Sequence, residues 1–64
     1  MSKAKGYTCV VYFKQVLDFE SVEIDVRAKD ADRARSKAER RVKLALELAG
    51  IEYTDLGADI TAEE

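Results

Sequence analysis

The clearest pattern of apolar and polar positions lies between Asp30 and Gly50, where small or aliphatic residues recur every three or four positions. This is the spacing of one face of an α-helix. Asp30 is a suitable N-cap, because its carboxylate can accept from free N–H groups of the first turn, and Gly50 suits the left-handed conformation that ends many helices. The sequence therefore predicts a helix over residues 31–49. Its predicted buried stripe consists of Ala31, Ala34, Ala38, Val42, Ala45, Leu46 and Ala49.

Two segments before the helix have the composition and alternation of β-strands. Residues 7–17 are rich in β-branched and aromatic side chains, and residues 19–28 alternate between apolar and charged positions. This period of two is typical of half-buried strands. Asp18 is the predicted turn residue between them. The side chains expected to face the core are Tyr7, Cys9, Val11, Phe13, Val22, Ile24, Val26 and Ala28.

A third, short strand is expected after the helix, over residues 52–56, with Gly57 breaking or bulging it. The chain then reads as one domain over residues 1–64, with flexible residues 1–6 and 61–64. The predicted fold class is α+β, a two-layer ββαβ arrangement with one long helix on one face of a three-stranded sheet. Placing the third strand beside the first, in order 2-1-3, makes the sheet antiparallel throughout.

Composition narrows the chemistry. Charged residues make up 38% of the 64-residue chain and hydrophobic residues 47%, and there is no histidine. The chain therefore lacks the side chain that most often acts as a general base near neutral pH. Cys9 alternates with core positions, so we expect it to be a buried apolar residue rather than a nucleophile. No calcium-loop, zinc or phosphate-binding spacing is present. We expect a protein that is not an enzyme and binds no metal or cofactor.

The same features bear on localisation. One cysteine excludes an intrachain disulfide, and no apolar run approaches the roughly 20 residues that span a bilayer. We expect a soluble, cytoplasmic protein without membrane contact.

Some apolar residues fall outside the predicted core. Four of them lie on or near the sheet face that a single helix leaves uncovered: Val10, Tyr12, Val16 and Phe19. Leu44 lies outside the helix stripe. Exposed apolar and aromatic residues often mark protein contacts. A homodimer is one such contact, and it is attractive for a chain with so small a core.

Charge is unevenly distributed about the net value of −2, and acids gather in the second strand and the tail. Acidic residues on an exposed strand can imitate a phosphate backbone and occupy a basic groove, although edge charges also serve to block aggregation. The predicted partner-binding residues are Val10, Tyr12, Phe19, Glu20, Glu23, Asp25 and Leu44.

The basic helix offers an alternative site. Its solvent side carries several cations that could contact nucleic-acid phosphates, whereas interleaved acids such as Glu39 and Glu47 favour an ordinary solvated face with i,i+4 pairs. The alternative nucleic-acid-binding residues are Arg33, Lys37, Arg40 and Lys43.

In size, acidity and ββα(β) pattern, the whole chain resembles small phage- or mobile-element-encoded inhibitors of host machinery, including anti-CRISPR proteins. The resemblance implies stoichiometric inhibition, in which the chain occupies the nucleic-acid site of a host complex such as a CRISPR effector in the host cytoplasm. We therefore expect a non-enzymatic protein-interaction module. The alternatives are a small nucleic-acid-binding protein that uses the basic helix, or a homodimeric accessory subunit.

Overall fold

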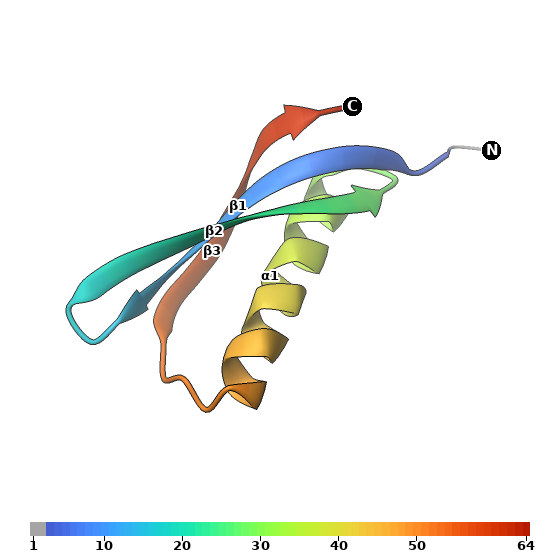
Figure 1. Cartoon of the computed structure of the whole chain (residues 1–64). Coiled ribbons are helices and arrows are strands. Elements are labelled where there is room, and N and C mark those ends of the chain that lie inside the picture. The colour runs from blue at the N-terminus through green and yellow to red at the C-terminus, as the bar shows by residue number, and fades with distance from the viewer. Residues whose placement is uncertain (1–2) are drawn as a thin grey trace.

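The computed structural model describes residues 3–64 as two layers, a three-stranded sheet with one helix on one of its faces (Figure 1). The elements follow the order β1 (Lys5–Gln15), β2 (Asp18–Ala28), α1 (Ala31–Leu48) and β3 (Thr54–Glu63). The sheet order is β2-β1-β3, and β1 is antiparallel to both neighbours. The predicted α+β fold and strand order 2-1-3 are therefore confirmed.

Both predicted helix caps are present. The side chain of Asp30 accepts a hydrogen bond of 2.8 Å from the backbone N–H of Arg33. At the other end Gly50 has φ 71°, and the N–H of Ile51 donates to the carbonyl of Leu46 at 2.9 Å. This is the bonding pattern of a Schellman motif, which ends the helix.

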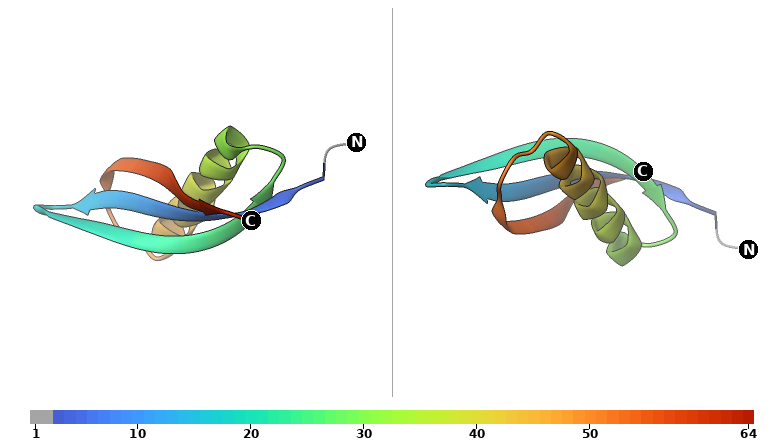
Figure 2. Two further views of the ribbon diagram at one scale, coloured as in Figure 1. Left: turned by 90° about the horizontal axis from the view of Figure 1, so that it is seen from above. Right: turned by 90° about the horizontal axis from the view of Figure 1, so that it is seen from below.

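The core lies between α1 and only one part of the sheet. On the helix, the buried residues Ala34, Ala38, Val42 and Leu46 are spaced four apart. Such a row is inclined to the helix axis, so it meets the sheet along a narrow line when the helix crosses the strands obliquely (Figure 2). The wider stripe predicted from the sequence is therefore wrong at its margins. The residues left exposed are Ala31, Ala45 and Ala49.

The two strands of the hairpin are buried to different extents. All four predicted core residues of β1 are buried, whereas only Val26 and Ala28 of β2 are. Ile24 is half-buried and Val22 is 40% exposed, contrary to the prediction. The reason is that the closed end of the hairpin projects past the helix, as Figure 1 shows.

The hairpin turn differs from the prediction. Gln15 pairs with Asp18, so Val16 and Leu17 form a two-residue turn and Asp18 is the first residue of β2. Val16 has φ 53°, a left-handed value that β-branched residues rarely adopt. A positive φ at only the first of two central residues is the pattern of a type II′ hairpin turn.

The third strand is longer than predicted, because β3 pairs along most of β1. Its register shifts twice, once at Asp55 and Leu56, which lie opposite Phe13, and once at Thr61. Asp55 has φ 55°, so the irregularity precedes Gly57, which itself pairs with Tyr12.

The chain ends also differ from the expectation of flexible segments. Residues 61–63 belong to β3 rather than to a frayed end, and Glu64 N–H donates to the carbonyl of Gly6 at 2.8 Å. Lys5 and Gly6 belong to β1. The prediction for residues 1 and 2 lies outside the described part of the chain.

Candidate interaction surfaces

The face of the sheet away from α1 carries side chains from all three strands. Cross-strand partners in an antiparallel sheet share a face, so Val10 lies between Glu23 of β2 and Asp59 of β3. We call this surface the outer sheet face. It comprises Thr8, Val10, Tyr12, Lys14, Phe19, Ser21, Glu23, Asp25, Gly57 and Asp59.

An aromatic ring fills the middle of the outer sheet face. A Cβ built on Gly57 would lie only 2.6 Å from ring atoms of Tyr12, so the ring covers this glycine. Tyr12 remains 38% exposed and Val10 is half-buried. The glycine thus lets the ring lie against the sheet, and the two residues form a low apolar surface.

Acidic groups surround this apolar surface. Asp25 accepts a hydrogen bond of 2.9 Å from Thr8 Oγ1. Toward the chain ends, Lys5 and Arg27 pair with Glu63 and Glu64 at 3.3 and 3.6 Å.

Those pairs neutralise one end of the sheet. In the described part of the chain Glu23 and Asp59 belong to no ion pair, so the centre of the outer sheet face remains negative.

The closed end of the hairpin carries three strongly exposed apolar side chains. Val16 is 90% exposed, Leu17 83% and Phe19 65%. The ammonium group of Lys14 lies 5.8 Å from the centroid of the Phe19 ring, within cation–π range. We call Val16, Leu17 and Phe19 the hairpin tip.

Leu17 is not among the predicted partner-binding residues, because the sequence predicts a strand that runs through residue 17. The two alternating segments leave only residue 18 between them, which indicates a tight turn nearby. The pairing of Gln15 with Asp18 places that turn at residues 16 and 17.

The structure brings together five of the seven predicted partner-binding residues and separates two. The outer sheet face holds Val10, Tyr12, Phe19, Glu23 and Asp25. Glu20 pairs with the buried Phe13 and so faces the helix side of the sheet. Leu44 is 55% exposed on α1. The seven residues therefore lie on more than one side of the molecule.

The alternative basic set is also divided. Arg33 pairs with Asp30 at 3.5 Å, and Lys37 Nζ donates to the carbonyl of Arg27 at 2.8 Å. Arg40 and Lys43 are exposed and have no ion-pair partner in the described part of the chain.

Arg35 extends the network along the helix. It pairs with Asp32, and this hydrogen bond and charge raise the pKa of its guanidinium.

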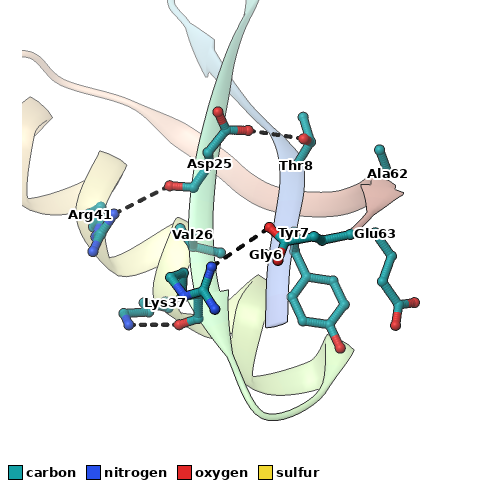
Figure 3. Close-up of a pocket in the computed structure, with 11 residues that line it drawn as sticks. Gly6, Tyr7, Thr8, Asp25, Val26, Lys37, Arg41, Ala62 and Glu63 are labelled. Atoms are coloured by element: carbon teal, nitrogen blue, oxygen red, sulfur yellow. Dashed lines mark hydrogen bonds and ion pairs between the residues drawn. The ribbon is translucent and has the colours of Figure 1, made fainter. Parts of the chain in front are cut away.

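A hollow at one end of the sheet brings residues from all four elements together (Figure 3). From α1, Lys37 and Arg41 extend to the carbonyls of Arg27 and Asp25, at 2.8 and 3.5 Å. Both cations thus donate hydrogen bonds to the backbone of β2, which lies at the edge of the sheet.

Two features of the described residues bear on catalysis and metal binding. Cys9 is fully buried, as predicted, and burial, with a smaller effect of Asp25, raises the pKa of its thiol. Residues 3–64 contain no cluster of three or more side chains suited to hold a metal ion. Within the same residues, α1 does not have the length and apolarity that crossing a membrane requires.

The comparisons with known proteins identify no family for this chain. No protein-family model, curated protein or solved structure matches the chain.

Proposed function

We propose that this chain is a non-enzymatic protein-binding module whose outer sheet face and hairpin tip bind a basic surface of a partner protein. The observation that carries this proposal is the projection of the hairpin past α1. It leaves Val16, Leu17 and Phe19 exposed beside a face whose centre is negative.

The hairpin tip contributes little to the fold and can contribute much to binding. Burying one large aliphatic or aromatic side chain stabilises a complex by about 1.5–3 kcal/mol. In the free chain these three side chains lie mostly in water. A partner that covers the hairpin buries these side chains, and this burial stabilises the complex. The two strands of the hairpin already hold the side chains in place, which lowers the entropic cost of binding.

Charge indicates the kind of partner. Glu23 and Asp59 flank Val10 from two sides, and Asp25 continues the negative row on β2. Such a surface is complementary to basic grooves, which in nucleic-acid-handling proteins contact phosphates. We infer a phage-type inhibitor, similar in format to anti-CRISPR proteins, that covers the nucleic-acid site of a host complex.

The test is affinity capture from a nuclease-treated bacterial lysate, followed by purification of the captured protein and a binding titration. The variant Glu23→Lys/Asp25→Lys should weaken binding at least tenfold, because it reverses charge on the outer sheet face. Glu39→Lys/Glu52→Lys is the matched control, since it makes the same change of charge on the helix and the loop after it. Single-stranded and double-stranded DNA or RNA are added as competitors.

Two results together support the proposal: selective loss of binding in the outer-face variant, and displacement of the chain by nucleic acid. Equal binding by both variants would show that the outer sheet face is not the contact. A complex that persists under saturating nucleic acid would show that the nucleic-acid site is not covered.

A second candidate function rests on the exposed cations Arg40 and Lys43. A nucleic-acid-binding protein would shift labelled DNA or RNA in a salt-dependent manner, and Arg40→Glu/Lys43→Glu would abolish that shift. An unchanged shift in this variant would exclude the helix face.

A further inference from the structure

The sheet has two edges, and one of them is interrupted along its length. The edge strand β3 shifts register at Asp55 and Leu56 and again at Thr61, and Asp55 has a positive φ. Bulges of this kind twist an edge and prevent another strand from pairing with it.

The other edge strand, β2, is protected over only half of its length. Lys37 and Arg41 donate to the carbonyls of Arg27 and Asp25, so these carbonyls point away from β1 (Figure 3). In an antiparallel strand every second residue presents its N–H and C=O to the same side. The backbone N–H and C=O groups of Glu23, Ser21 and Phe19 therefore also point away from β1.

No side chain of the described residues caps this remaining half. Among these residues, the side-chain hydrogen bonds to the β2 backbone run from Lys37 to Arg27 and from Arg41 to Asp25, and none reaches the segment nearer the hairpin turn. The segment 19–23 is thus a strand edge with its hydrogen-bonding groups in water, which is a template for pairing with another chain.

Apolar surface lies directly beside this edge, on the helix side. Residues 37, 41, 44 and 48 recur at three and four positions and share one flank of α1. Since Lys37 and Arg41 reach β2 from this flank, Leu44 and Leu48 lie on it too, and they are 55% and 81% exposed. A neighbouring apolar groove is lined by Phe13, Val22, Ile24, Arg41, Val42, Ala45 and Leu46.

We propose that a second copy of this chain pairs with segment 19–23 of β2, antiparallel about a two-fold axis near Ser21. The pairing joins two three-stranded sheets into one of six strands. Leu44 and Leu48 of each copy then pack against the groove of the other. We call Leu44, Leu48 and the neighbouring groove the patch. It contains both the projecting leucines and the groove that receives them, as a two-fold interface requires.

The charges around the patch fit a second copy. Along this side of α1, Arg40 and Arg41 lie toward the N-terminus and Glu47 toward the C-terminus. Glu20 lies on the helix side of the hairpin. A two-fold axis reverses the direction of the second copy, so the arginines of one copy face the glutamates of the other.

The first measurement is sedimentation velocity of the full chain from low micromolar to millimolar concentration. A dimer of twice the chain mass is expected to form as concentration rises. Amide hydrogen exchange then locates the contact, because the N–H groups of Phe19, Ser21 and Glu23 should become protected only in the dimer.

Three changes test the geometry. Ser21→Pro removes an N–H that has no partner in the free chain and should abolish dimers, with the circular dichroism spectrum retained. Leu44→Glu/Leu48→Glu should do the same without altering the sheet. Arg40→Glu and Glu47→Arg should each weaken dimerisation about tenfold, and the double variant should restore it.

A chain that stays monomeric at millimolar concentration would overturn the proposal, as would a dimer unaffected by both Ser21→Pro and Leu44→Glu/Leu48→Glu. The outer sheet face remains open in this dimer. Leu44→Glu/Leu48→Glu changes no residue of the outer sheet face or the hairpin tip. This variant should therefore still bind the basic partner proposed above, so the two proposals are tested separately.

Discussion

The ring of Tyr12 covers Gly57 across the pair of β1 and β3, and a Cβ at Gly57 would meet the ring at 2.6 Å. Gly57→Ala should therefore lower the free energy of unfolding by about 1 kcal/mol, because the ring must move. In a Tyr12→Ala background the same change should instead stabilise by about 0.5 kcal/mol, since glycine is unfavourable within a strand. Urea unfolding of all four chains measures both values. An equal effect in both backgrounds would show that the ring and the glycine are not coupled.

Val16 combines a positive φ of 53° with 90% exposure at the hairpin turn. A left-handed conformation costs an L-residue about 1–2 kcal/mol, part of which glycine recovers. Val16→Gly should raise the free energy of unfolding by up to about 1 kcal/mol. Leu17→Gly is the control, because Leu17 has no positive φ. This variant should have an unchanged or lower free energy of unfolding. A stabilisation of both variants would mean that turn strain is not the cause.

Leu46 and Leu48 are two residues apart on α1 and differ in burial, at 7% and 81% exposed. Leu46→Ala should destabilise the chain by about 2–3 kcal/mol, because it removes a core side chain and leaves a cavity. Leu48→Ala should change stability by less than about 0.5 kcal/mol. Thermal and urea unfolding are measured at low protein concentration, where self-association does not contribute. Similar losses for both variants would place the helix in a different rotation on the sheet.

Burial of Cys9 raises its thiol pKa above the ordinary value of 9.0, so the folded chain keeps a proton that the unfolded chain releases. The thiol therefore contributes stability below pH 9.0 that is lost as the pH rises further. The stability difference between the wild type and Cys9→Ala should shrink as the pH rises above 9.0. A difference that stays constant above pH 9.0 would contradict the raised pKa.

Local patterns predicted the elements of this fold well. The helix ends follow from Asp30 and Gly50, whose caps depend on groups within one turn of the chain. The inward residues of β1 follow from strict alternation. The third strand is longer than predicted, because Ala62 and Glu63 have weak strand propensity and belong to β3 through their pairing with Thr8 and Tyr7 of β1.

The candidate site was predicted only in part. The alternation of β2 could have placed Glu20 and Glu23 on opposite faces, and the structure shows this separation through their partners Phe13 and Val10. The hairpin tip could not be predicted from alternation alone. Val16 and Leu17 look like the end of a buried strand until the pairing of Gln15 with Asp18 makes them a turn.

Local sequence patterns suffice for the order of the elements, the limits of the helix and the residues that share a face of each strand, because these depend on contacts between near neighbours along the chain. The part of the sheet that the helix covers depends instead on packing between segments far apart in the chain. Val22 and Val26 occupy equivalent positions in the alternation of β2, yet Val26 is 3% exposed and Val22 40%. The difference arises because burial depends on where α1 crosses the sheet, and the hairpin extends beyond that crossing.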